Sequence, residues 1–168
     1  SVAREFGVSP EAIEAGFKQA ERVFGRQEFF QVGDKKVLLN LVKNPVGLDQ
    51  VLALIKLDPE PYNLVAILNN RYADGTDVSW IWDGDFEGLH ALNAVDTAIS
   101  GIRVEDLGVR MEVAGFENIK VFKTNAELID WIRKAPTNKV NVLATYTALL
   151  DLRKDFAKEG YLKEGMNG

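Results

Sequence analysis

The chain has 168 residues, 46% hydrophobic and 27% charged, which is enough for one domain with a packed core. Its net charge of −5 argues against a nucleic-acid surface, and no apolar run is long enough to span a bilayer. There is no cysteine and the single histidine is His90, which excludes disulfides, thiolate metal sites and most zinc sites. Together with the lack of a signal peptide, these features favour a globular protein of the cytoplasm.

The N-terminal part is expected to hold a helix and a β-hairpin. Because the chain starts at Ser1 rather than Met, and its first residues already have helical character, we expect it to be part of a longer protein. Ser9-Pro10-Glu11 has the composition of a helix start, and the helix should run through residue 23. Strands over 29–32 and 37–42, joined by a Gly-Asp-Lys turn, form the predicted hairpin.

After residue 43, predicted helices and strands alternate to the end of the chain. Helices are expected over 48–57, 86–92, 104–114, 124–132 and 147–156. Strands are expected over 64–68, 78–83, 95–100, 119–122 and 140–144. This order predicts an α/β domain of three layers, with a Rossmann-like, mostly parallel sheet and helices on both faces. Ligands of such sheets bind at the carboxyl ends of the strands.

Residues 73–83, ADGTDVSWIWD, concentrate three aspartates and two of the three tryptophans. Asp74-Gly75 is a turn signal, and the alternation that follows is typical of a strand. One face of that strand would carry Val78, Trp80 and Trp82, and the other Asp77, Ser79, Ile81 and Asp83. A carboxylate at the mouth of this strand is placed for chemistry or recognition, and the alternative is a turn followed by a core strand.

The acidic residues of this region admit three interpretations. They could hold a divalent cation, although their spacing does not match the Asp-x-Asp-x-Asp-Gly calcium loop. One of them could orient a catalytic histidine, which would come from a partner because the chain has only His90. They could also serve only as turn and helix caps. His90 itself is expected to be a partly buried helix residue rather than a ligand.

Two further places have the composition of an anion site. Lys43-Asn44-Pro45 precedes a predicted helix, where a cation, an amide and a helix N-terminus suit a phosphate or carboxylate. The alternative is a turn with a solvated lysine. Arg26 could clamp a phosphate or carboxylate, or form a surface ion pair at a hinge. Thr147, near the start of the last helix, is expected to be its N-cap.

The stretch 73–87, ADGTDVSWIWDGDFE, resembles the hallmark of the MurT C-terminal domain family. The blocks KNPVG at 43–47 and YTALL at 146–150 match that family in the same order. Phe24-Gly25-Arg26 is similar to the junction between the central and C-terminal domains of Mur ligases. The resemblance covers nearly the whole chain. It implies that residues 1–24 end the central domain and that residues 25–168 form the C-terminal α/β domain.

MurT proteins are the ligase-like subunit of lipid II isoglutaminyl synthase, and their partner GatD is a glutaminase with a cysteine and a histidine. The resemblance implies a complex that uses ATP, Mg²⁺ and glutamine to amidate the D-glutamate α-carboxylate of the peptidoglycan stem, through an acyl phosphate. It also implies that Asp77 completes the Cys-His pair of GatD, with Asp83 as the second choice. Lys43, Asn44 and Arg26 would then contact nucleotide or lipid II substrate at the membrane face.

The chain also departs from complete MurT proteins. It lacks the Walker-type ATP loop and the zinc-ribbon cysteines found in many of them. We therefore expect this chain to be inactive by itself and to bind no cofactor tightly. The alternative function is a non-catalytic docking module of a ligase complex. A free-standing small-molecule enzyme is disfavoured by the missing phosphate loop and the truncated start.

Overall fold

A six-stranded sheet with the order β1-β2-β6-β3-β4-β5 runs through the computed structural model, which describes residues 28–161. β1 (Glu28–Val32) and β2 (Lys35–Leu41) form the predicted antiparallel hairpin. All other neighbouring strands pair in parallel, as expected. These strands are β3 (Asn63–Ile67), β4 (Thr97–Ser100), β5 (Lys120–Val121) and β6 (Lys139–Ala144).

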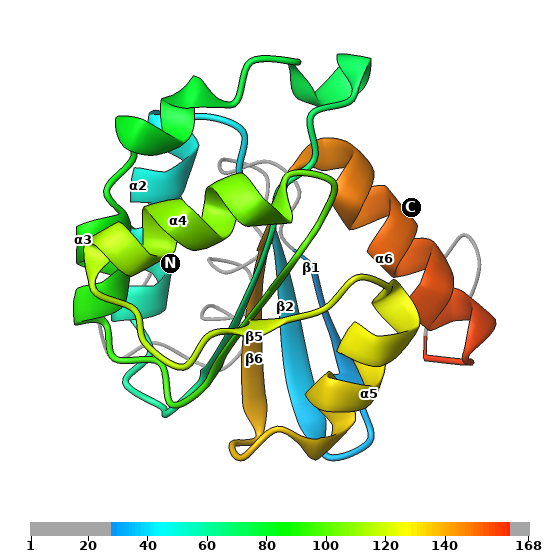
Figure 1. Ribbon diagram of the computed structural model, residues 1–168. Helices are drawn as coiled ribbons and strands as arrows, with labels where there is room; N and C mark the ends of the chain where they lie inside the picture. The colour runs from blue at the N-terminus through cyan, green and yellow to red at the C-terminus, as the bar shows by residue number, and fades with distance from the viewer. Residues whose placement is uncertain (1–27, 162–168) are drawn as a thin grey trace, which may run out of the picture.

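Helices cover both faces of the sheet (Figure 1). One face carries α2 (Pro45–Lys56), α3 (Phe86–Ala91) and α4 (Val104–Ala114), and the other carries α5 (Asn125–Lys134) and α6 (Tyr146–Lys158). Each side has its own apolar cluster, and β3 contributes Leu64 to the first and Val65 to the second. The mostly parallel sheet with helices on both faces confirms the three-layer α/β prediction.

The ends of the helices follow their local sequence signals. Asn44 is the N-cap of α2 and accepts the Gly47 N–H at 2.7 Å, so this helix begins at Pro45 and not at residue 48. The Thr124 hydroxyl accepts the Glu127 N–H at the start of α5. Gly115, with a φ of 114°, ends α4 in the left-handed region, as expected of a C-cap glycine.

The carboxyl ends of β2, β6, β3 and β4 meet at one edge of the sheet, which we call the carboxyl edge. The segment that follows β3 extends beyond this edge before the chain enters α3, and it lies at the top of Figure 1. It contains two 3-10 helices, η1 (Tyr72–Asp74) and η2 (Ser79–Trp82). Asp74, Asp77 and the two tryptophans of this segment therefore lie where ligands of parallel sheets bind.

The prediction of a strand over residues 78–83 is wrong, because the segment is a 3-10 helix. The Ile81 N–H donates to Val78 O and the Asp83 N–H donates to Trp80 O. A three-residue repeat turns Ile81 into the core, where it is 1% exposed, and leaves Trp82 53% exposed. The carboxylate of Asp77 accepts a hydrogen bond from the Ser79 N–H, and this local bond favours a turn over strand pairing.

Two smaller predictions are also corrected. The N-cap of α6 is Thr145, and Thr147 lies inside its first turn. His90 is exposed rather than partly buried, and its ring meets the edge of Phe116 with centroids 5.1 Å apart. The predicted helix over residues 9–23, the proposed unit 1–24 and Arg26 lie outside the described residues. None of the helices between residues 28 and 161 has the length and apolarity needed to cross a membrane.

Candidate functional site

Asp74 anchors the segment beyond the carboxyl edge. Its Oδ1 accepts the Thr147 N–H at 2.7 Å, and its Oδ2 accepts the Thr147 hydroxyl at 2.6 Å and the Arg71 N–H at 3.0 Å. The residue is only 9% exposed. Thr147 belongs to the first turn of α6, where free N–H groups and the helix dipole favour a negative charge. Asp74 therefore closes its own turn and ties it to α6.

Asn69 connects three strand ends at the same edge. Its backbone N–H donates to the Thr145 hydroxyl, and its Nδ2 donates to the Thr147 hydroxyl. Its Oδ1 accepts the Ile102 N–H at 2.9 Å. Since Asn69 follows β3, Thr145 follows β6 and Ile102 follows β4, one buried amide fixes the relative positions of all three loops. No local sequence signal indicates this role of Asn69, because its partners are 33 to 78 residues away.

Asp77 lies on the same loop but points away from the core. It is exposed, and within the described chain its carboxylate is bonded by Ser79, whose N–H lies 2.8 Å from Oδ1. These bonds, first from the backbone N–H and then from the hydroxyl, lower the pKa of Asp77. An ionised, outward-facing carboxylate can accept an N–H from an imidazole of another molecule.

Arg110 of α4 binds the segment that contains Trp80 and Trp82. It was not among the site residues predicted from the sequence. The residue is 3% exposed and donates Nε–H to Ile81 O at 2.7 Å and Nη2–H to Gly84 O at 2.9 Å. Its guanidinium also bonds both carboxylate oxygens of Glu87 and thereby lowers the Glu87 pKa. The available signal was its place beside Met111 on the apolar face of a predicted helix.

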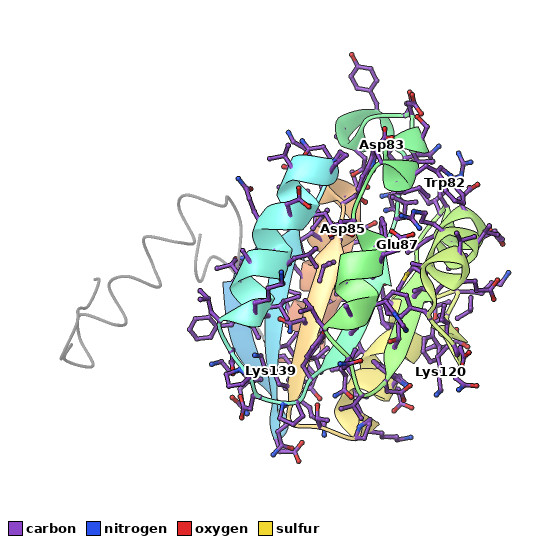
Figure 2. The ribbon with its side chains drawn as sticks, turned by 90° about the vertical axis from the view of Figure 1, so that its left-hand side faces the viewer. Trp82, Asp83, Asp85, Glu87, Lys120 and Lys139 are labelled. Carbon is purple, nitrogen blue, oxygen red and sulfur yellow. The ribbon has the colours of Figure 1, made fainter. Side chains whose placement is uncertain are left out.

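Of the other two aspartates in this segment, one caps a helix and one is exposed. Asp85 caps α3 by accepting the Gly88 N–H at 2.9 Å, whereas Asp83 is exposed. Figure 2 shows Asp83 and Trp82 toward the upper end of the molecule, opposite Lys120 and Lys139 at the amino ends of their strands. Among residues 28–161, no group of three His, Cys, Asp or Glu side chains could hold a metal ion.

Lys43 and Asn44 reach the carboxyl edge at the end of β2. Lys43 is exposed beside the N-terminus of α2, and the Asn44 amide oxygen is occupied by the helix-capping bond to Gly47. The structure thus places both at the same edge as Asp77, with no hydrogen bond joining them to it in the described part of the chain. The Asn44 oxygen therefore serves as a helix cap, whereas the Asn44 amide group and Lys43 are chemically suited to an anion.

Two cavities differ in their relation to this edge. One of about 240 Å³ opens at the ends of β3 and β4 and is lined by polar groups that include Asn69, Arg71 and Lys123. A larger one of about 470 Å³ lies beside His90 at the amino ends of β4 and β5, at the other end of the strands from Asp74 and Asp77. Because parallel sheets bind ligands at their carboxyl ends, the smaller cavity is the better candidate for a substrate group.

The chain is similar to part of a named subunit of bacterial synthases. The Streptococcus pneumoniae R6 protein named lipid II isoglutaminyl synthase (glutamine-hydrolyzing) subunit MurT is 38% identical over 169 residues, which cover 99% of this chain and 38% of the relative. The Staphylococcus aureus COL protein of the same name is 32% identical over 137 residues, which cover 78% of this chain and 31% of the relative. The chain thus spans well under half of these relatives.

The fold recurs in folylpolyglutamate synthase from Thermotoga maritima, whose crystal structure matches with a TM-score of 0.53 and 21% identity. The match covers 95% of this chain and 36% of that structure. The model of the family described as MurT ligase C-terminal matches residues 41–149. That stretch runs from the end of β2 to the first turns of α6 and includes Asp74, Asp77 and Arg110. The chain therefore belongs to the MurT ligase C-terminal family.

Proposed function

We propose that this chain is the C-terminal domain of the ligase subunit of a lipid II isoglutaminyl synthase, and that Asp77 completes the active site of the glutaminase subunit. The observation that carries the proposal is the contrast within one loop. Asp74 is buried and fully engaged, whereas Asp77 is held at the surface by Ser79 alone among the described residues. The names of the relatives, which describe a subunit of a glutamine-hydrolysing synthase, support the first part of the proposal, the assignment to a ligase subunit.

In this proposal the carboxylate of Asp77 accepts the N–H of a histidine on the glutaminase. That bond sets the tautomer of the imidazole and stabilises the imidazolium formed when the histidine takes the proton of the nucleophilic cysteine. The partner must supply both groups, because the chain has no cysteine and His90 lies near the amino ends of β4 and β5. The ammonia released from glutamine would then pass to the ligase subunit.

The ligase reaction is the second part of the proposal. The α-carboxylate of the D-glutamate in lipid II would take the γ-phosphoryl group of magnesium-bound ATP, and ammonia would displace the phosphate to leave the amide. Lys43 and the Asn44 amide group, at the carboxyl edge, are the proposed contacts to nucleotide or substrate, together with Arg26. The reaction would occur on the cytoplasmic face of the membrane.

The test compares Asp77→Asn with Asp83→Asn in the complete two-subunit enzyme. We expect Asp77→Asn to reduce the kcat of glutamine hydrolysis by a factor on the order of 100 or more. The neutral asparagine side chain would no longer hold the glutaminase histidine in one tautomer or stabilise its imidazolium form. Asp83→Asn removes a neighbouring charge and serves as the matched control, with an expected change below about twofold. Full glutaminase activity in the Asp77→Asn complex would contradict the proposal.

A docking module without a catalytic role is the second candidate. It is favoured by Trp82, an aromatic side chain that is 53% exposed beside the acidic residues, as in many protein interfaces. In that case Asp77→Asn would change the dissociation constant of the two subunits and leave kcat unchanged once the partner is saturating. Titrating the glutaminase against each variant separates the two functions.

A further inference from the structure

We infer that Arg110 is a positioning residue for Asp77, acting through the 3-10 helix Ser79–Trp82. The inference rests on the proposed function for its catalytic consequence, but its structural part stands on contacts within this chain. Arg110 is 3% exposed, and its hydrogen bonds go to Ile81, Gly84 and Glu87 rather than to Asp77. It binds the far end of the short helix whose first N–H is held by Asp77.

The guanidinium is buried and makes several contacts with residues 81–87. Four hydrogen bonds reach Ile81 O, Gly84 O and the two carboxylate oxygens of Glu87, at 2.7 to 3.0 Å. The rings of Trp82 and Phe86 lie with their centroids 5.3 and 5.1 Å from its central carbon, within the range of cation–π contacts. One side chain of α4 therefore fixes the backbone, an acid and two aromatic rings of residues 81–87.

We call the contacts of Arg110 with Ile81, Gly84 and Glu87 the clamp. The clamp controls the direction of the Asp77 side chain. At one end of η2 the carboxylate of Asp77 accepts the Ser79 N–H, and at the other the Ile81 carbonyl accepts from Arg110. The helix is a single turn, so little of its own hydrogen bonding resists a rotation if one end is released. A shift of about 1 Å in a catalytic group can cost on the order of 100-fold in rate.

Arginine suits this position for a geometric reason. Its planar fork sends donors to two carbonyls and a carboxylate at once, whereas a lysine ammonium has three donors on a single atom and cannot span them. Replacing Arg110 by lysine keeps the charge but leaves some of the acceptors Ile81 O, Gly84 O and Glu87 unpaired. The conservative change therefore tests the clamp rather than the charge.

The experiment measures Arg110→Lys in the complete two-subunit enzyme, with Arg133→Lys as the control. Arg133 also bonds a glutamate, Glu159, and lies 5.6 Å from the ring centroid of Tyr161, but it belongs to α5 on the opposite face of the sheet. We expect Arg110→Lys to lower the glutaminase kcat roughly tenfold at saturating partner, with a change below twofold in the control. Amide hydrogen exchange over residues 79–87 should quicken by about tenfold or more only in Arg110→Lys.

A double variant separates positioning from general damage. In an Asp77→Asn background, adding Arg110→Lys should lower kcat by less than about twofold, because the group it positions is already impaired. An equal loss in both backgrounds would overturn the inference, as would unchanged kcat or unchanged exchange in Arg110→Lys. If Arg110→Lys does not fold, Glu87→Gln decides by the same readouts, with an expected fall in kcat of about twofold to fivefold.

The failure of the inference differs from the failure of the proposed function. Full activity of Asp77→Asn overturns the proposed function, and with it the catalytic part of the inference. Impaired Asp77→Asn together with fully active Arg110→Lys and Glu87→Gln overturns the inference alone.

Discussion

Asp74 and Asp77 lie three residues apart in one turn, yet they face opposite environments. Asp74 accepts three hydrogen bonds, two of them from Thr147, which is 73 residues away. Asp77 accepts its bonds from Ser79, two residues away, and is exposed. The difference teaches that a single acidic motif can supply both a buried structural anchor and an exposed carboxylate, which is the group that we propose to act in the glutaminase site. The buried aspartate holds the turn on α6 so that the exposed one keeps a fixed place.

The largest effect should come from Asp74→Ala. We expect it to lower the free energy of unfolding by about 3 kcal/mol, because the Thr147 N–H and hydroxyl and the Arg71 N–H all lose their acceptor in a buried place. Denaturant unfolding measures this loss. The matched variant Asp77→Ala should change the unfolding free energy by less than about 0.5 kcal/mol. Equal losses in the two variants would remove the contrast between these residues.

Thr147→Val sharpens the comparison from the other side of the contact. The change keeps the shape of the side chain but removes the hydroxyl that donates to Asp74 and accepts from Asn69. We expect a loss of about 1.5 kcal/mol in unfolding free energy. Thr147→Ser keeps the hydroxyl and should lose clearly less. A loss in the serine variant as large as that in the valine variant would assign the effect to packing instead.

Gly75→Ala tests the backbone that separates the two aspartates. Gly75 has a φ of 87°, and an added Cβ would meet no atom within 4 Å, so only backbone strain opposes the change. We expect a cost of about 1 kcal/mol. Gly101→Ala is the contrasting variant at the same edge, because its Cβ would lie 2.4 Å from Leu68 O and should cost more. Thermal unfolding of the two variants ranks them.

The smallest effect concerns the titration of Asp77. Its pKa in the folded protein is lowered by the Ser79 backbone N–H and then by the Ser79 hydroxyl, so these bonds stabilise the fold above about pH 4 and are lost as the pH falls through the folded pKa. Ser79→Ala removes only the hydroxyl and should raise the pKa part of the way toward its ordinary value. The NMR chemical shift of the Asp77 carboxyl carbon, followed as a function of pH, measures this pKa in the wild type and in the variant. A wild-type pKa at or above the ordinary value would show that the bonds to Ser79 do not hold the carboxylate.

Local signals were sufficient to predict most of the sheet and helices. The Gly-Asp-Lys turn predicted the hairpin, the apolar run of β3 predicted a strand buried on both faces, and Thr124 and Gly115 marked helix ends correctly. Each of these features depends on neighbours within a few residues. The mostly parallel pairing of the strands followed from the alternation of helices and strands.

The parts that sequence reasoning missed depend on distant partners. Ile81 and Trp82 fit an alternating strand as well as a 3-10 turn, and what distinguishes the two is Arg110, 29 residues from Ile81. Threonine is a common N-cap residue, but the hydroxyl of Thr147 donates a hydrogen bond to Asp74, 73 residues away. The sequence therefore predicted that this segment lies at the end of a strand of the parallel sheet, and not how its side chains divide between core and surface.

The most direct test of the account is the kcat of glutamine hydrolysis by the complete two-subunit enzyme carrying Asp77→Asn, with the glutaminase subunit saturating. We expect kcat to fall on the order of 100-fold or more, with the dissociation constant of the subunits nearly unchanged. A kcat equal to that of the wild-type enzyme would contradict it.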